Sequence, residues 1–193
     1  DFLEGLSYIN GEKGLQIITA YFFVSMFAFA APGTVVLPFF KAQPHLGVLW
    51  YTYVMGGGVV GRLLGGALQY RFTYPAQKKF AISLFVYVAV ALLEGSYLFF
   101  PVTIMMALCL LSGMLQITSY NIRVAATQTY VPNEYRGRFN GSFQMICTLG
   151  TILGQLLSGA LADLTSERTV QALFMAINLL AVFAIMLPGR KYV

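Results

Sequence analysis

Six long apolar stretches dominate this chain and leave it very few possible folds. They cover residues 15–39, 49–68, 80–99, 102–125, 143–162 and 172–187. Each holds about 20 residues, the number that an α-helix needs to cross a hydrocarbon core of about 30 Å. A chain that is 58% hydrophobic and only 10% charged has too few polar residues to cover a soluble globule. We therefore predict an all-α integral membrane protein with six transmembrane helices.

A near-repeat divides the chain into two similar parts. The sequence GRLLGGAL at residues 61–68 returns as GQLLSGAL at residues 154–161, in the second and the fifth apolar stretch. Because an odd number of crossings separates the two copies, they run in opposite directions through the bilayer. Inverted repeats of this kind are typical of secondary transporters. The pattern predicts two inverted three-helix repeats.

The basic residues predict the orientation of the helices. They gather in the loops of one side, and only Lys41 and Arg168 lie clearly on the other. By the positive-inside rule, both termini and the second and fourth connections are cytoplasmic, in a plasma membrane. Short basic loops between spans form no single soluble face, so the net charge of +5 does not indicate nucleic-acid binding. The residues on the basic side are Lys13, Arg71, Lys78, Lys79, Arg136, Arg138, Arg190 and Lys191.

The sequence contains no pattern for enzymatic chemistry. Cys109 and Cys147 both fall within apolar stretches, where free cysteines are commonly small buried residues. His45 is the one histidine and lies in a loop, so no metal site is expected. The connections are too short for a catalytic domain, and no phosphate-binding glycine loop is present. We expect no cofactor, no metal and no enzyme activity.

Residues 1–14 differ from the rest in being amphipathic. Apolar residues at positions 2, 3, 6 and 9 have helical spacing, and charged residues lie between them. This pattern is typical of a short helix at the membrane interface. We predict an interfacial linker over residues 1–14, entering from a preceding domain, and a transmembrane domain over residues 15–193.

Small residues recur every four positions in the second and fifth spans, which keeps them on one helix face. Such stripes allow helix backbones to approach closely in lipid. Ordinary packing within the bundle explains them, and so does a contact with another domain that moves during transport. We assign them to such a moving interface. The stripes are Gly57, Gly61 and Gly65 in one span and Gly150, Gly154 and Ser158 in the other.

Two cytoplasmic segments carry a resemblance to a known family. Residues 130–141, YVPNEYRGRFNG, contain the pattern Pro-x-x-x-Arg-Gly-Arg at Pro132, Arg136, Gly137 and Arg138, and a glycine-rich span runs into Arg71. With these segments the chain resembles the carboxy-terminal six-helix half of a major facilitator superfamily transporter. Within that superfamily it is similar to macrolide and multidrug efflux exporters of the bacterial inner membrane.

The resemblance implies a twelve-helix parent whose two halves rock around a central cavity. The partners would be the lipid bilayer, the amino-terminal six-helix half and a small-molecule solute, with protons as a candidate coupling ion. Spans one, two, four and five would face the cavity or the other half, and spans three and six would face lipid. In the family's basic loop after the second span, Tyr70 and Thr73 replace the usual Asp and Gly, which favours an anchoring role for Arg71.

Three ionisable residues fall inside the predicted spans. Arg62 lies near the middle of span two and either faces a cavity or extends its side chain to the cytoplasmic surface. Arg123 lies near the cytoplasmic end of span four, where we expect an interfacial anchor. Glu94 lies near the outer end of span three, and we expect an interfacial position for it as well. Proton coupling would then depend mostly on acids of the other half.

The remaining polar residues in the spans are candidates to line the cavity. Pro32 and Gly33 interrupt span one and form either a substrate-site break or a structural bend. Aromatic and methionine side chains such as Phe22, Met26, Met114 and Met145 would form an adaptable apolar wall. The candidate set is Tyr21, Ser25, Thr34, Arg62, Gln116, Asn121, Gln144, Thr148 and Gln155.

We interpret the chain as half of a secondary active transporter that exports amphipathic, drug-like compounds by antiport. An uptake permease for a small metabolite is the first alternative. A membrane receptor or scaffold that moves no solute is the second.

The charge asymmetry generates a prediction about topology. In a background without Cys109 and Cys147, His45→Cys and Glu167→Cys should react with an impermeant thiol reagent added to intact cells, whereas Asn133→Cys should not. The reason is that basic loops are retained on the cytoplasmic side. Labelling at residue 133 in intact cells would invert the orientation.

Overall fold

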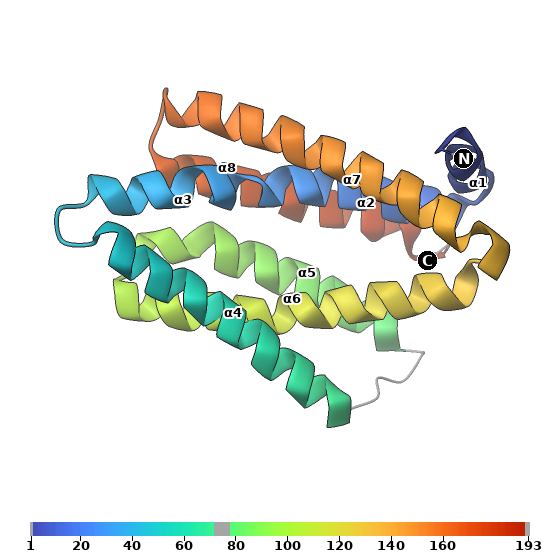
Figure 1. Ribbon diagram of the computed structural model, residues 1–193, viewed down its shortest axis with the longest axis horizontal. Helices are drawn as coiled ribbons and strands as arrows, with labels where there is room; N and C mark the ends of the chain where they lie inside the picture. The colour runs from blue at the N-terminus through green and yellow to red at the C-terminus, as the bar shows by residue number, and fades with distance from the viewer. Residues whose placement is uncertain (1, 72–77, 192–193) are drawn as a thin grey trace.

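The computed structural model describes residues 2–71 and 78–191, which form helices joined by short turns (Figure 1). The predicted all-α class is confirmed for this part of the chain, which contains no strand. Short helical turns follow α5 at Tyr97–Phe99 and α8 at Val182–Met186 and Pro188–Lys191. The α-helices are α1 (Phe2–Gly11), α2 (Lys13–Phe29), α3 (Ala31–Ala42), α4 (Gly47–Arg71), α5 (Lys79–Ser96), α6 (Val102–Tyr130), α7 (Asn133–Ala162) and α8 (Glu167–Ala181).

Five segments of the described chain are long and apolar enough to cross a membrane, which indicates a membrane protein. They are Lys13–Ala42, Lys79–Phe99, Val102–Val124, Asn133–Ala162 and Glu167–Met186, and each overlaps one predicted span. The other predicted span, residues 49–68, falls in α4. This helix has 25 residues, enough to cross a bilayer, but it is less apolar than the five. Glycine is nearly neutral in hydropathy and Arg62 is strongly polar, so these residues lower the mean hydropathy of α4.

The first span is one apolar segment with a break. The helix is interrupted at Ala30, between α2 and α3, and Pro32 lies in the first turn of α3. Proline has no N–H to donate, and its ring crowds the carbonyl four residues earlier, so the helix cannot continue undisturbed. Thr34 Oγ1 donates to the carbonyl of Ala30 at 3.4 Å. The predicted interruption near Pro32 and Gly33 is confirmed.

The helices lie in two layers, and helices of the first half of the chain pack against helices of the second half. In Figure 1, α2, α3, α7 and α8 form one layer, and α4, α5 and α6 form the other. The first half of the chain contains α2 to α5, and the second half contains α6 to α8. Helix α2 of the first half contacts α7 and α8 of the second, and α6 of the second half contacts α4 and α5 of the first. The third helices, α5 and α8, contact each other. The two halves are therefore interlocked through equivalent pairs.

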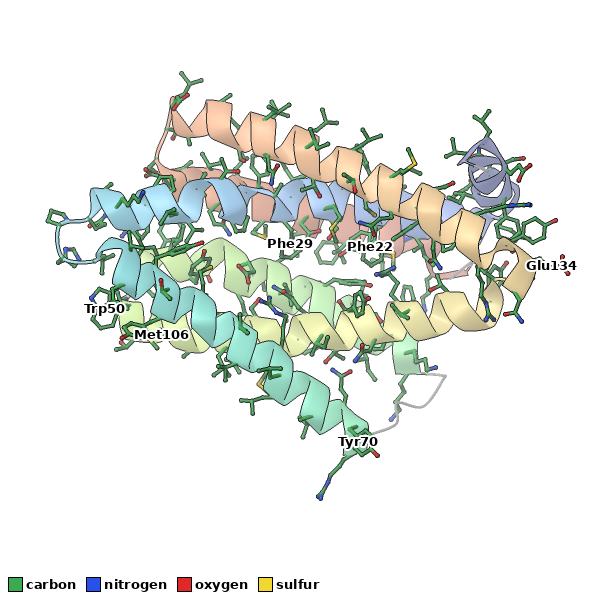
Figure 2. All side chains as sticks on the ribbon, viewed as in Figure 1. Phe22, Phe29, Trp50, Tyr70, Met106 and Glu134 are labelled. Carbon is green, nitrogen blue, oxygen red and sulfur yellow. The ribbon has the colours of Figure 1, made fainter. Side chains whose placement is uncertain are left out.

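The turns lie at two opposite ends of the helices. Both termini lie at one end, together with the turn between α6 and α7, while the turns after α3, α5 and α7 lie at the other (Figure 1). Trp50 and Glu134 mark the two ends in Figure 2. The termini and the turn between α6 and α7, which the charge pattern assigns to one side of the membrane, thus share one end of the molecule. Residues 72–77 of the second connection lie outside the described residues. The loop position of Thr73 lies outside the described residues.

Helix α1 packs on α7, and only some of its apolar residues are buried in this contact. Leu3 is 77% exposed, whereas Ile9 is buried and Gly5 lies against the backbone of Arg138. Glu4 forms an ion pair with Arg138 at 3.1 Å, and Tyr8 stacks on Tyr135. The small size of Gly5 decides the contact, because only glycine lets the two helices come so close.

The other basic-motif residues stabilise the turn between α6 and α7. Pro132 precedes the first turn of α7, and Arg136 Nε donates to the carbonyl of Val131 at 2.8 Å. Glu12 accepts a hydrogen bond from the Tyr130 hydroxyl at 2.8 Å, and this bond raises the pKa of the phenol. Gly137 has open space where a side chain would be, and Arg71 ends α4 with an exposed side chain. The turn is therefore tied to the amino-terminal segment.

The glycine stripe of α4 faces α6 inside the same chain. A Cβ placed on Gly57 would lie 3.0 Å from the carbonyl oxygen of Met106, and one on Gly61 would overlap the carbonyl of Leu110. Gly113 of α6 completes the contact, because a Cβ there would overlap the carbonyl of Gly58. The backbones of α4 and α6 therefore touch along this face.

The stripe of α7 has an equivalent partner in α2. A Cβ on Gly150 would lie 2.5 Å from the carbonyl oxygen of Phe23, and one on Gly154 would overlap the carbonyl of Phe27. This corrects the expectation that the stripes themselves meet a second six-helix domain. The small residues fill contacts between the two halves of this chain, and the opposite faces of α4 and α7 are exposed. The corrected residues are Gly57, Gly61, Gly65, Gly150, Gly154 and Ser158.

Helices α5 and α8 each combine an exposed apolar side with a packed side. Phe85 and Leu92 of α5 and Leu180 of α8 are more than half exposed, as expected for helices that face lipid. Their other sides carry buried polar groups, among them Gln171 and Asn178 of α8. The expectation that these two helices face lipid is therefore incomplete, because they also form the centre of the bundle.

The glycine contacts generate a prediction about stability. Gly61→Ala and Gly154→Ala should each lower the free energy of unfolding by about 1–3 kcal/mol, because the new methyl group would push two backbones apart. Thermal unfolding of the purified protein in detergent measures the effect.

Gly66→Ala is the matched control for this substitution. Nothing lies within 4 Å of the Cβ position of Gly66, and alanine is the better helix former, so the Tm should stay unchanged or rise. Equal Tm values for all three variants would contradict the glycine contact.

Candidate functional site

A cavity of about 520 Å³ lies between the two layers of helices. Five helices line it, α2, α4, α5, α6 and α8, so both halves of the chain contribute. This volume lies within the range of small-molecule sites. The lining residues are Phe22, Ser25, Met26, Phe29, Arg62, Tyr87, Val90, Gln116, Ile117, Ser119, Tyr120, Arg123 and Asn178.

One wall of the cavity is apolar and comes mainly from α2. Phe22 and Phe29 lie two helical turns apart and point from α2 toward α5 and α6 (Figure 2). Met26 lies between them on the same face, and Ser25 adds a buried hydroxyl. Phenylalanine and methionine form surfaces that adapt to different apolar ligands. Of the side chains predicted for the apolar wall, Phe22 and Met26 line the cavity, whereas Met114 and Met145 do not.

Arg123 lies at the cavity wall among three aromatic rings. Its guanidinium carbon lies 4.9 Å from the ring centre of Phe22, 5.3 Å from that of Tyr120 and 5.1 Å from that of Phe143. These are cation–π distances. The Nε atom is buried, and no described residue accepts a hydrogen bond from it. Arg123 is therefore a cavity residue, which corrects the expectation of an interfacial anchor.

Glu94 belongs to a hydrogen-bonded cluster behind the cavity. Its Oε1 atom accepts from Ser112 Oγ at 2.6 Å and from Gln116 Nε2 at 3.2 Å. Gln171 of α8 donates to the backbone carbonyl of Glu94 at 2.9 Å. The side chain thus links α5 to α6, and the expectation of an interfacial position is wrong. Sequence reasoning missed it because helical spacing does not reveal which neighbouring helix a side chain faces.

Arg62 lies on the cavity wall, which is the first of the two placements considered for it. The close contact of α4 with α6 brings it there, since Gly113 of α6 packs beside the Arg62 backbone. Arg62 also interacts electrostatically with Glu94. The guanidinium therefore has an acidic neighbour on α5.

Three of the predicted cavity residues line the cavity, namely Ser25, Arg62 and Gln116. Tyr21 is buried beside the Tyr87 ring instead, at 4.8 Å between ring centres. Asn121 donates to Gln69 Oε1 at 2.8 Å, in the contact between α6 and α4. Four others lie outside the cavity because α7 and α3 do not reach it: Thr34, Gln144, Thr148 and Gln155.

The structure adds cavity residues that sequence reasoning did not select. Ser119 lies three residues after Gln116 on the same face of α6, so helical spacing from Gln116 would have found it. Asn178 is 1% exposed, and its Oδ1 atom has no hydrogen-bond partner among the described residues. It is the one polar residue in the otherwise apolar span 172–187, and that contrast was a usable signal.

The cavity offers no metal site in the described part of the chain. No group of three or more His, Cys, Asp or Glu side chains is close enough to hold an ion there. Comparison of the chain with protein-family models, curated proteins and solved structures finds no match. The function therefore has to be argued from the site itself.

The geometry of the cavity generates a prediction about access. In a background without Cys109 and Cys147, Ser25→Cys and Ser119→Cys should react with a small polar thiol reagent, because both residues line the cavity. Ser83→Cys is the matched control, since Ser83 is buried to a similar extent as Ser25 but does not line the cavity. A reaction rate at residue 83 equal to that at residue 25 would contradict the cavity.

Proposed function

We propose that this chain is one six-helix half of a secondary active transporter that exports amphipathic organic solutes by alternating access. The cavity between the two layers carries this proposal. It has the volume of a small-molecule site, and it lies where the two halves of the chain meet. Substrate sites of secondary transporters lie at repeat interfaces.

The exchange of contacts between the halves supports the inverted-repeat part of the proposal. The pairs α2 with α7 and α6 with α4 are equivalent, and glycine faces form both. The faces of α4 and α7 that point away from the glycine contacts are apolar and exposed. Leu63 of α4 and Leu156 of α7 are more than half exposed. In the proposal, these faces meet lipid and the amino-terminal six-helix half. The basic motifs at Arg71 and Pro132 favour the major facilitator superfamily.

The composition of the cavity supports an amphipathic solute. Phe22, Met26 and Phe29 form the apolar wall, and the polar groups of Gln116 and Ser119 lie on the other side. A solute with one apolar and one polar side would satisfy both. Apolar residues that repack favour several solutes over one.

We place proton coupling at Glu94. Among the described residues it is the carboxylate that hydrogen-bonds to a cavity-lining side chain, Gln116. An ionisable residue inside a membrane segment is costly and commonly serves ion or proton movement. The titratable or charged groups that interact with it are Arg62 of α4, Cys109 of α6 and Tyr97 after α5. Protonation would release the Arg62 charge from its acidic neighbour and so change the cavity.

Flux through the full-length protein in proteoliposomes tests the proposal. With an imposed proton gradient, the wild type should move at least one member of a set of fluorescent amphiphiles of positive, zero and negative charge against its concentration gradient. Glu94→Gln keeps the shape and the hydrogen bonds of the side chain but cannot release a proton. In this variant, the flux driven by the proton gradient should be at least tenfold lower than in the wild type. Movement of the solute down the solute's own concentration gradient should remain.

Asp163→Asn is the control, because Asp163 is an exposed acid in the turn after α7. It should transport like the wild type. A wild type without flux of any amphiphile would favour a receptor or scaffold. Flux toward the opposite side would indicate an uptake permease, and unchanged coupling in Glu94→Gln would remove the proton from this site.

A further inference from the structure

The charged groups on the cavity wall all have the same sign. Arg62 and Arg123 line the cavity, and no acidic side chain is among its lining residues. Glu94 lies behind the wall, where Ser112 and Gln116 hold its carboxylate. A solute in the cavity therefore meets two guanidinium groups and no exposed carboxylate from the described chain.

The two arginines differ in how their charge is balanced. Glu94 interacts electrostatically with Arg62, whereas aromatic rings surround Arg123, and neither arginine forms an ion pair with a described acidic residue. The three rings around Arg123 offset part of the cost of its charge, since cation–π contacts are attractive. They accept no conventional hydrogen bond, and the buried Nε atom stays without a partner. Arg123 is thus an incompletely satisfied cation beside an open cavity.

An anionic group is the chemical complement of this site. The planar guanidinium presents parallel N–H donors that match the oxygens of a carboxylate, sulfonate or phosphate. The rings of Phe22 and Tyr120, with Met26 nearby, offer flat apolar surface to the rest of the ligand. Asn178 adds a buried acceptor oxygen without a partner, which can take a donor from the ligand.

From this arrangement, and resting on the proposed function, we infer that the solute is an aromatic organic anion whose negative group binds Arg123. The apolar wall from α2 holds the ring system, and Arg62 keeps its electrostatic interaction with Glu94. The cavity selects by charge because two guanidinium groups and no carboxylate lie on its wall, so a cation is repelled and an uncharged ligand leaves the Arg123 charge without a counter-charge.

Equilibrium binding to the full-length protein in detergent tests the inference. Naphthalene-2-sulfonate and naphthalene-2-sulfonamide share one ring system and differ in charge. The sulfonate should bind about 10- to 100-fold more tightly, the range for a charge-assisted hydrogen bond. Arg123→Gln should remove this difference by weakening sulfonate binding while sulfonamide binding stays within about twofold, which also shows that the cavity is intact.

Arg168→Gln is the matched control. Arg168 of α8 also lies over a ring, 4.9 Å from the centre of Phe39, and its Nε atom is likewise buried without a partner. It does not line the cavity, so its substitution should leave sulfonate binding unchanged. Arg123→Lys keeps the charge but loses the planar fork and should bind with intermediate affinity.

Equal affinity of the wild type for the two compounds would overturn the inference, and so would sulfonate binding that survives in Arg123→Gln. The first comparison uses only the wild type and holds even if a variant fails to fold. If the protein transports uncharged amphiphiles and shows no preference for the sulfonate, the proposed transport function stands and the anion site is refuted. If the sulfonate binds at Arg123 but no solute is transported, the anion site stands and the proposed transport function is refuted.

Discussion

Backbone contact between helices at glycine is the constraint on which the rest of this structure depends. Lipid is as apolar as leucine, so burial of side chains alone does not pull helices together inside a membrane. In this chain, Gly61 lies on the backbone of α6 and Gly154 on the backbone of α2. These two contacts join the first half of the chain to the second. The contact of α4 with α6 also brings the Arg62 backbone beside Gly113, which a wider helix separation would prevent.

Polar groups in the interior are arranged as a consequence of these contacts. Glu94, Ser112 and Gln116 form hydrogen bonds between α5 and α6, and Gln171 links α8 to the same point. An unpaired carboxylate at this depth would be costly, so the cluster stabilises the packing of three helices. The same cluster carries the carboxylate that could bind and release a proton. In the proposed function, the structural and functional roles therefore coincide at Glu94.

The cavity lies where the two layers fail to close completely. Large side chains of α2, such as Phe22 and Phe29, keep α5 and α6 at a distance, while the glycine faces draw the outer helices close. The result is a space with an apolar wall, a polar wall and an arginine between aromatic rings. A membrane protein tolerates such a charge where it borders a cavity that water or a ligand can enter.

The sequence by itself determined the helical class, five of the membrane segments and the interruption of the first span. Length, hydropathy and the missing N–H of Pro32 act locally, so they can be read without a structure. The stripe of glycines at Gly57, Gly61 and Gly65 could also be recognised in the sequence, but the helix against which it packs could not. Only the tertiary structure assigned that face to α6, turned Arg123 toward Phe143 and placed Glu94 against Ser112. The physical reason is that spacing along a helix defines a face, whereas the neighbour of that face depends on how every helix packs.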